Sequence, residues 1–446
     1  MAPEDSQYLD KYSTPADAAH ETDRIIVIGV GGGGNNAVDH MFRQAVEHVS
    51  FVVVNTDRQA LESSLVPNKL LIGPSTTRGR GAGNKPERAR EAAEESAVEI
   101  ANIFNDDTDM VFVTAGMGGG TGTGAAPIVA RIAKERGLLT IGIVTIPFLF
   151  EGMKKIQKAL TGAEEMSKYV DALMLVNNER LVEIYPDFEF ESAFAKADDI
   201  LSTAASSIAE IVTKKGYINL DFNDVDTTLR DGGTAIITVG YGEGENRVTK
   251  AIQDALHSPL LKHTDVLSSK RILFNLYYSP KANMRFKASE AKELNDFINR
   301  VEQEVDVIWG ITYDESLGDK VKFTILASGF DVTVNENKGQ VFTAETPAKT
   351  HEEEGPVEID KIAEVYGEKV GEMVRARETQ NYILLDESGC DDDEEIKRFE
   401  SSPTFSRNKR PATGGALASA VAPKTEKTVK PAAPKPNEIS FGEDDL

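Results

Sequence analysis

Two glycine-rich segments, each placed directly after a short apolar run, constrain this chain more than any other feature. The first, GVGGGG, occupies residues 29–34, follows RIIVI and precedes Asn35 and Asn36. The second, GMGGGTGTG, occupies residues 116–124 and follows MVFVTA. Glycine lets the backbone approach a phosphate closely, and a helix N-terminus offers N–H groups that no carbonyl within the helix accepts. Each succession of strand, glycine turn and helix therefore predicts a phosphate-binding loop.

The first segment alone leaves two kinds of ligand open. It satisfies G-x-G-x-x-G with Gly29, Gly31 and Gly34, and Asp57 lies at the end of the next apolar run, a pattern also typical of NAD-dependent oxidoreductases. A dinucleotide fold has one phosphate turn in each nucleotide half, whereas two turns at neighbouring strand ends would wrap a single polyphosphate. Neither turn carries the lysine of a P-loop. The sequence therefore favours a nucleoside polyphosphate, with an NAD-dependent oxidoreductase as the alternative.

The first half of the chain alternates short apolar runs with amphipathic stretches. We expect strands at 51–55, 110–116, 138–148 and 171–178, and helices at 35–46, 86–104, 124–136 and 152–168. Such alternation is typical of an α/β fold with a doubly wound parallel sheet. The stretch that follows repeats apolar residues every three or four positions, which predicts a long central helix with Gly216 at its C-terminal cap.

A second, smaller α/β unit follows that helix. TAIITVG, RILFNLYY, VDVIWGITY and VKFTILASGF are its expected strands, and 245–256 and 287–303 its expected helices. Because these strands alternate more and contain less glycine, we expect a mixed or antiparallel sheet. The predicted organisation is a flexible extension (1–23), a nucleotide-binding domain (24–189), a central helix (190–216), a second domain (217–331) and a disordered linker and tail (332–446).

Composition narrows the possible partners and the compartment. The formal net charge of −24 argues against a nucleic-acid partner, and it predicts that self-assembly depends on salt and divalent cations. No apolar run approaches ~18 residues and the first 23 residues are polar, so we expect neither direct membrane insertion nor secretion. Cys390 is the single cysteine and the six histidines are scattered, which suggests no metal site built from side chains. These features together indicate a cytoplasmic protein.

Once the second glycine segment is considered in full, the chain resembles a known family. GGGTGTG (118–124) resembles the signature of the tubulin/FtsZ family of GTPases, and from Arg24 to Phe330 further segments resemble its FtsZ branch in order: GVGGGGNNAV (29–38), NTD (55–57), GAGNKPE (81–87), PFLFEG (147–152), NNERL (177–181), AFAKADD (193–199) and NLDFNDV (219–225). The resemblance implies a GTP-dependent cytoskeletal GTPase that polymerises head to tail into the filaments of a division ring at mid-cell.

The resemblance also implies roles for single residues around GTP or GDP. It places the α- and β-phosphates on Gly31, Gly32, Gly33 and Asn36, the γ-phosphate and Mg²⁺ beside Gly81, Ala82, Gly83 and Asn84, and a phosphate cradle at Gly118, Gly119, Gly120, Thr121, Gly122 and Thr123. Glu151 would hold the ribose, Phe194 would stack on the base, and Asn178 and Asp198 would bind the guanine edge. Lys155 stands where the family usually has arginine, and it keeps the charge without the planar fork.

The segment Asn219–Val225 carries the predicted catalytic residues Asn219, Asp221 and Asp224. Taken alone, its two carboxylates are compatible with a solvated acidic loop in which Asp224 caps the next helix. The resemblance implies instead that this loop enters the nucleotide site of the next subunit, where Asp221 and Asp224 orient water and complete the Mg²⁺ shell. Such a contact joins two different faces, so it propagates a filament. A tubulin-like scaffold that binds GTP without hydrolysing it is the second alternative.

Departures from the family pattern occur in the loop and in the tail. Leu220 and Asn223 replace smaller residues, and Asp226 replaces a residue that is commonly basic, so we expect hydrolysis to be slowed rather than lost. Within the tail, 402–407 (SPTFSR) resembles the family's partner-binding peptide, although it lies well before the last residue. We therefore expect 394–410 to bind membrane-anchor and division proteins. Another segment of the tail, 357–378, is expected to form a transient helix.

Overall fold

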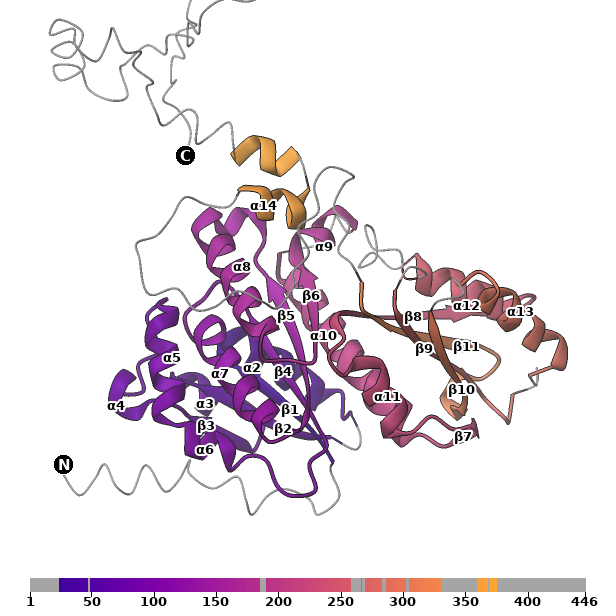
Figure 1. The fold of residues 1–446 in the computed structure, drawn as a ribbon, viewed down its shortest axis with the longest axis horizontal. Helices are drawn as coiled ribbons and strands as arrows, with labels where there is room; N and C mark the ends of the chain where they lie inside the picture. Colours follow the sequence, from indigo (N-terminus) through magenta and orange to yellow (C-terminus); the bar gives the residue numbers. More distant parts are fainter. Residues whose placement is uncertain are drawn as a thin grey trace, which may run out of the picture. The chain divides into compact units, whose positions relative to one another are not determined.

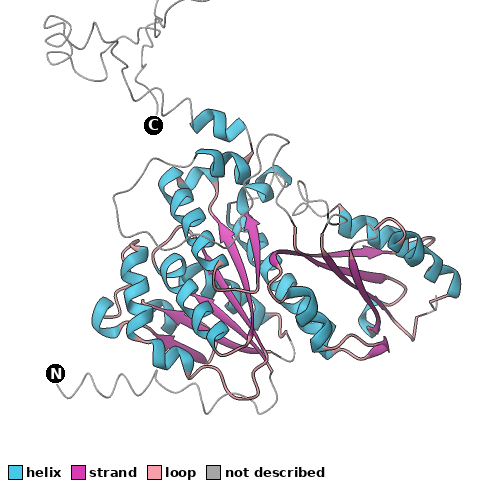
Figure 2. Cartoon of the chain, viewed as in Figure 1, coloured by secondary structure: helices cyan, strands magenta, loops and turns pink. Residues whose placement is uncertain are grey.

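The structure is a computed structural model that describes residues 24–46, 49–184, 190–257, 266, 269–282, 286–301, 305–330, 359–367 and 369–374. All of these belong to one compact unit that ends at Arg375. Figure 1 shows the helices and strands of this unit, and Figure 2 distinguishes them by colour. The extension expected over 1–23 and the docking segment expected over 394–410 lie outside the described residues.

A parallel sheet forms the first half of this unit. Its strands are β1 (Ile25–Val30), β2 (Ser50–Asn55), β3 (Asn68–Leu71), β4 (Met110–Gly116), β5 (Leu139–Ile146) and β6 (Ala172–Asn177). They lie in the order β3-β2-β1-β4-β5-β6, and every pair is parallel. The predicted doubly wound sheet is confirmed. The strand order reverses between β1 and β4, and ligands of such sheets bind outside the carboxyl ends of the strands at that reversal.

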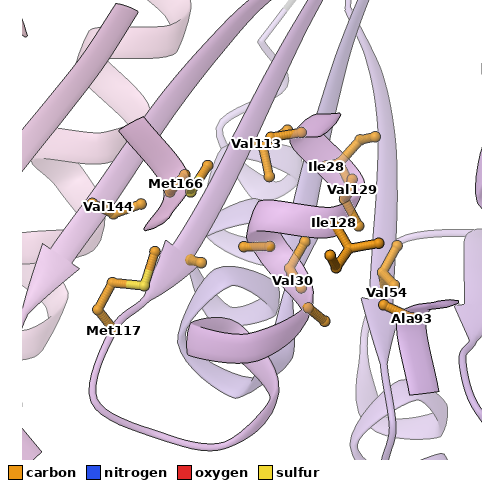
Figure 3. Close-up of a cluster of buried hydrophobic side chains, with 14 of the residues drawn as sticks. Ile28, Val30, Val54, Ala93, Val113, Met117, Ile128, Val129, Val144 and Met166 are labelled. Atoms are coloured by element: carbon orange, nitrogen blue, oxygen red, sulfur yellow. The ribbon is translucent and has the colours of Figure 1, made fainter. Parts of the chain in front are cut away.

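Helices cover both faces of this sheet, because side chains along each strand point alternately to opposite faces. On one face, Ile28 and its neighbours pack against α5 (Pro86–Glu95), α7 (Thr121–Glu135) and α8 (Met153–Ser167). Figure 3 shows part of this first core, where Ile28 and Val54 face Ile128 and Val129 of α7. On the other face, Val27 and its neighbours form a second core with α2 (Gly31–Arg43) and α10 (Phe190–Thr213).

Four shorter helices complete this half of the unit: α3 (Arg58–Ser63), α4 (Pro74–Thr77), α6 (Ala97–Ala101) and α9 (Asn178–Ile184). A 3₁₀ turn, Leu149–Glu151, precedes α8. The helix expected over 86–104 is broken at Ser96, which separates α5 from α6.

The second half contains a mixed sheet, as predicted. Its strands are β7 (Gly216–Ile218), β8 (Gly233–Gly242), β9 (Arg271–Tyr278), β10 (Asp306–Tyr313) and β11 (Val321–Ser328), and its helices are α11 (Phe222–Leu229), α12 (Arg247–Leu256) and α13 (Ala288–Ile298). Strand β10 runs parallel to β9, whereas β11 runs antiparallel to both β8 and β9. A short parallel pairing of β6 with β8 makes the two sheets continuous.

The long central helix is confirmed, but its predicted end is wrong. Helix α10 spans 24 residues and ends at Thr213, before Gly216. Gly216 opens the edge strand β7, where a Cβ would lie only 2.1 Å from the carbonyl oxygen of Ile311 in β10. Glycine is needed at this position because β10 approaches it closely, so it does not serve as a helix cap.

Part of the tail is folded onto the first half. Helix α14 (Ile359–Tyr366) buries Ile362 and Tyr366, which lie one helical turn apart and join the first core. The prediction of a merely transient helix over 357–378 therefore underestimated its packing. The polar composition of the tail as a whole concealed this short amphipathic stretch, and the remainder of 332–446 lies outside the described residues.

Candidate functional site

The first glycine-rich turn joins β1 to α2, and its glycines serve two purposes. A Cβ at Gly31 (φ +75°) would lie 2.6 Å from Gly122 N, and a Cβ at Gly34 would lie 2.3 Å from the carbonyl oxygen of Thr114. Both positions are glycine because this turn touches the second turn and β4 directly. A Cβ at Gly32 would meet no described atom within 4 Å, so protein packing leaves that space to a ligand.

The second turn joins β4 to α7 and is held by two threonines. Thr123 Oγ1 accepts a hydrogen bond from Gly118 N at 2.8 Å. Thr121 Oγ1 lies 2.7 Å from Thr56 Oγ1, just beyond the end of β2. A Cβ at Gly119 would, like one at Gly32, meet no described atom within 4 Å. The sequence contains glycine at these two open positions, which fits close approach by a phosphate.

A third segment, Gly81–Asn84, completes this edge of the sheet. A Cβ at Gly120 would lie 3.0 Å from Ala82 Cβ, and Gly81 N donates to Thr56 O at 3.0 Å. The last two residues of the segment are exposed. The three segments meet at the carboxyl ends of β1, β2 and β4, where α2 and α7 both begin. Two helix N-termini in one place create a favourable environment for a polyphosphate.

Every phosphate contact predicted from the sequence lies in one of these segments. Gly33 and Asn36 are exposed on the first turn of α2 and just beyond it, and Gly122 is buried where α7 starts. The grouping of the predicted residues is therefore reproduced by the fold, while their contact with a nucleotide stays a prediction.

Residues predicted to bind guanine come from the end of β6 and from α10. Asn178 follows β6 directly, and its buried Oδ1 has no hydrogen-bond partner among the described residues. A buried acceptor left unpaired costs ~1–3 kcal/mol, so a donor from a ligand is favoured there. Phe194 is 37% exposed and packs edge-on against the buried Phe148. An unpaired acceptor and a partly exposed ring both fit a guanine base, whose exocyclic amine donates hydrogen bonds.

Asp198, on the same helix as Phe194, has a perturbed carboxyl group. Burial raises the pKa of this carboxyl to about 6, the His40 ring opposes the rise, and the Asp199 carboxylate adds to it. The His40 ring lies 2.7 Å from Asp199 Oδ1, so it is already engaged. A half-buried carboxylate has lost part of its hydration and gains from two ligand donors, and guanine offers N1–H and its exocyclic amine.

Glu151, predicted to hold the ribose, is oriented by its neighbours. Its Oε1 accepts from Phe148 N at 2.9 Å, and its Oε2 pairs with Lys155 Nζ. Lys155, predicted as a nucleotide contact, thus orients Glu151 one helical turn away. Glu179 Oε2 accepts from Leu149 N at 2.8 Å, which ties the loop after β5 to the start of α9.

Two residues that organise this site were not identified from the sequence. Thr56 is fully buried and contacts both the Thr121 hydroxyl and Gly81 N. Asn177 ends β6, and its Oδ1 accepts from Glu179 N at 3.0 Å. Each is a polar residue at the carboxyl end of a buried strand, and that position was the signal that could have identified them.

Asp57, which supported the NAD alternative, has a local structural role. Its Oδ1 accepts hydrogen bonds from Gln59 N at 2.9 Å and from Ala60 N at 3.4 Å, so it caps α3. An N-terminal cap accounts for an aspartate at this position without any ribose contact.

The predicted catalytic carboxylates form a reciprocal cap at the start of α11. Asp221 Oδ1 accepts from Asp224 N at 3.1 Å, and Asp224 Oδ2 accepts from Asp221 N at 2.8 Å. Asn219 Oδ1 accepts from Gly216 N at 2.7 Å. The cap expected for a plain acidic loop is thus present, with Asp221 at its first position. It uses one oxygen of each carboxylate and fixes the two groups relative to each other.

Two departures from the family pattern have local structural roles. Leu220 is buried over Gly310 of β10, where a Cβ would lie 2.6 Å from Leu220 Cγ. Asp226 Oδ1 accepts from Nε of Arg230, the residue that directly follows α11, at 2.8 Å. Neither residue takes part in the cap formed by Asp221 and Asp224.

The glycine-rich turns lie at the carboxyl ends of the parallel strands, whereas the acidic loop, Asn219–Val225, lies towards the amino ends of the strands. Helix α10 begins beyond the carboxyl end of β6 and, with 24 residues, runs ~36 Å back along the sheet (Figure 1). After α11, Gly233 N donates to the carbonyl oxygen of Asp171, directly before β6 begins. The loop therefore lies towards the amino end of β6, and it cannot reach the glycine-rich turns of its own chain.

The described residues contain no group of three His, Cys, Asp or Glu side chains that could hold a metal ion. Mg²⁺ at nucleotide sites keeps several waters and takes its other ligands from phosphates and one or two carboxylates, so the donor set here fits Mg²⁺ only together with a nucleotide. Within the same part of the chain, no helix has the length and apolar character needed to cross a membrane.

Comparison with known proteins gives consistent matches. Family models for the GTPase domain of the tubulin/FtsZ family and for the C-terminal domain of the FtsZ family match residues 24–186 and 233–331. Cell division protein FtsZ of Porphyromonas gingivalis is 50% identical over 392 residues, which covers 86% of this chain and 85% of that protein.

More distant relatives agree. Cell division protein FtsZ 1 of Thermococcus kodakarensis is 39% identical over 340 residues, covering 76% of this chain and 88% of that protein. A solved structure of an empty FtsZ dimer from M. jannaschii is 37% identical, with a TM-score of 0.63, and covers 74% of this chain and 93% of that one.

Two alanine substitutions distinguish a glycine that leaves space for the ligand from a glycine that protein packing requires. Gly32→Ala places a methyl group in open, exposed space of a helical turn, so we expect a Tm that is unchanged or slightly raised and GDP affinity weakened by about tenfold. Gly34→Ala drives a methyl group into the carbonyl of Thr114, so we expect the free energy of unfolding to fall by ~1–3 kcal/mol. Thermal melts and titration with a fluorescent GDP analogue measure both effects. Wild-type affinity in Gly32→Ala would contradict the phosphate assignment.

Guanine binding should depend on the ionisation of Asp198. GDP binding favours the ionised carboxylate, and in the free chain the pKa of the Asp198 carboxyl is about 6. GDP affinity should therefore be constant above pH ~7. Well below pH 6 it should fall by about tenfold for each pH unit. Titrations of GDP into wild type and into Asp198→Asn between pH 5 and pH 8 measure this dependence. The phosphates of GDP titrate equally in both series, so the difference between the two pH profiles removes their contribution. The same pH profile in both proteins would show that Asp198 does not bind the base.

Proposed function

Since this chain belongs to the tubulin/FtsZ family of GTPases and matches its cell-division branch, we propose that it polymerises head to tail and hydrolyses GTP between successive subunits. As a cell-division cytoskeletal GTPase, it binds GTP and GDP. One observation supports the proposal: the glycine-rich turns lie at the carboxyl ends of the parallel strands and the acidic loop lies towards their amino ends. Each chain would therefore present the nucleotide half of a hydrolytic site at one end and the acidic half at the other.

The nucleotide half of the site is formed by residues at the carboxyl edge. Backbone N–H groups of the two glycine-rich turns and of Gly81–Asn84 surround the phosphates, with Gly32 and Gly119 leaving room for them. Asn178 and Asp198 accept hydrogen bonds from guanine, and Phe194 contacts its face. Adenine cannot offer the donor pair that Asp198 accepts, which gives the site its preference for guanine.

The hydrolytic half is supplied by the next subunit. Its capped loop brings Asp221 and Asp224 to the γ-phosphate with their mutual geometry already fixed, and the oxygens that the cap does not use orient the attacking water. Asn219 lies at the start of the same loop. Most of the rate enhancement then comes from positioning the water and stabilising charge on the phosphoryl group. Hydrolysis therefore requires a subunit contact.

Mg²⁺ bound together with the nucleotide beside Gly81–Asn84 would neutralise part of the phosphate charge. On the protein side, Asp221 and Asp224 of the incoming loop would complete its ligand shell. A chain with a net charge of −24 also repels its copies, so both salt and divalent cations should promote assembly.

The contact joins two different faces and need not close on itself, so repetition of it produces a filament. The relative from M. jannaschii was solved as a dimer, in keeping with self-association. We place the filament in the cytoplasm at mid-cell. The segment 394–410, outside the described residues, would bind membrane-anchor and division proteins; anchor binding that survives deletion of this segment would contradict that role.

GTP turnover per subunit should rise with protein concentration, from near zero in dilute solution, in the presence of Mg²⁺. Asp224→Asn keeps an oxygen that can cap Asp221 N but removes the charge, so we expect turnover to fall by at least about a hundredfold while GDP affinity is unchanged. Asp226→Asn is the matched control, because it removes one negative charge from the same helix while Asp226 takes no part in the cap. Phosphate release measured across a concentration series provides the data.

Two outcomes would contradict this mechanism. Turnover per subunit that is independent of concentration would mean that one chain contains a complete active site. GTP binding and filament formation without any turnover in the wild type would favour the non-hydrolysing scaffold.

A further inference from the structure

The folded part of the tail is a small helical hairpin, which we call the tail hairpin. It consists of α14 and a second helical stretch, residues 369–374, joined at Gly367. Gly367 has φ +94°, a value that side chains disfavour, and Gly367 N donates to Ala363 O at 2.8 Å. A Cβ at Gly371 would lie 2.4 Å from Ala363 Cβ. The close turn and close packing both depend on glycine, so this hairpin has a defined tertiary structure.

The tail hairpin is packed against the carboxyl edge of the first half. Ile362 is 1% exposed and Tyr366 is 5% exposed, and both belong to the first core with residues of β5 and α8. Lys361 Nζ pairs with Glu164 Oε2 of α8 at 2.8 Å. Figure 1 shows α14 beside α8 and near β6. Buried apolar side chains supply most of the stabilisation, and the exposed ion pair adds little.

Two hydrogen bonds connect the hairpin to the strand ends that carry the predicted guanosine contacts. Tyr366 Oη donates to Pro147 O at 2.6 Å, directly after β5 and four residues before Glu151. Asn177 Nδ2 donates to Val365 O at 2.8 Å, and Asn177 immediately precedes Asn178. The hairpin thus holds both the loop with the predicted ribose ligand and the strand end with the unpaired acceptor.

The same two strand ends are also connected to each other. Asn177 uses its Oδ1 to accept from Glu179 N, and Glu179 accepts from Leu149 N. Burial raises the pKa of the Tyr366 hydroxyl well above its ordinary range, and the Glu179 and Glu151 carboxylates add to the rise. The phenol therefore stays protonated and remains a donor. Tyr366 lies within the electrostatic range of the residue predicted to hold the ribose.

We propose that the tail hairpin is a positioning element of the guanine site, in which Tyr366 and Val365 fix the ends of β5 and β6 and so hold Glu151 and Asn178 where guanosine binds. This inference rests on the proposed function, because it assumes that these two residues contact the nucleotide. Tyr366 acts through Pro147, so it is a positioning residue and not a catalytic one.

The consequence for the reaction is base selectivity. Asn178 Oδ1 can accept from the exocyclic amine of guanine, and hypoxanthine lacks that amine. A site that fixes an acceptor discriminates strongly against a ligand without the donor, whereas a site whose acceptor can move to water does not. A docked hairpin should therefore increase the preference for GDP over inosine diphosphate.

The test compares GDP and inosine diphosphate affinities in the full chain, at concentrations below the assembly threshold. Ile362→Asp places a carboxylate in the core and undocks the hairpin, so we expect GDP affinity to fall by about tenfold and the ratio of the two affinities to fall by about fivefold. Tyr366→Phe keeps the ring and removes only the donor, so a decrease of about threefold in GDP affinity is expected. Glu372→Ala, at an exposed hairpin position, should match the wild type.

Addition of a peptide with the sequence of residues 357–376 should restore the ratio in Ile362→Asp. A lower Tm with an unchanged affinity ratio in both hairpin variants would overturn the inference, since it would mean that the hairpin only stabilises the fold. The proposed function fails in a different way, namely if the wild type itself binds GDP no better than inosine diphosphate and ADP.

Discussion

Direct backbone contact between the two glycine-rich turns is the constraint on which the rest of the structure depends. A side chain at Gly31 would collide with Gly122, and one at Gly34 would collide with β4. Because α2 and α7 both begin at this contact, two helix N-termini converge where the strand order of the sheet reverses. The glycines that touch no protein, Gly32 and Gly119, remain on the open side of that contact. Some glycines of these turns are therefore required by packing, and their neighbours leave the space in which we propose that the phosphates bind.

The length of α10 then separates the two halves of the proposed hydrolytic site. This helix of 24 residues runs from the carboxyl ends of the parallel strands towards their amino ends. The capped pair Asp221 and Asp224 lies just after it. The cap makes the carboxylates rigid, while Leu220 over Gly310 fixes the loop to the second sheet. A rigid acidic loop on one face and a phosphate site on the other would account for the hydrolysis between stacked subunits that we propose. The proposed role of the tail hairpin extends the same arrangement, because the hairpin contacts the ends of β5 and β6, beside the predicted guanosine contacts.

Helices and strands whose apolar residues recur at a regular spacing were predictable from the sequence. Short elements, and elements that depend on tertiary contacts, were not. The parallel strands, the mixed second sheet and α10 follow from apolar periodicity. Strand β7 has three residues, and the glycine that opens it resembled a helix cap because the approach of Ile311 is a tertiary contact. The phosphate turns were predicted from spacing alone, whereas Asn178 and Asp198 came only from the family resemblance, since the burial that distinguishes them is not encoded locally. The tail hairpin was obscured by the polar composition around it.

The central claim is that one active site is shared by two subunits, and mixing two defective variants tests it most directly. Asp224→Asn retains an intact nucleotide site, and Asp198→Ala retains an intact acidic loop. In mixed filaments, about a quarter of random head-to-tail contacts join the intact nucleotide site of one variant to the intact loop of the other. Our account predicts that the equal mixture hydrolyses GTP at up to about a quarter of the wild-type rate, well above either variant alone. Turnover equal to the mean of the separate variants, in filaments shown to contain both, would contradict it.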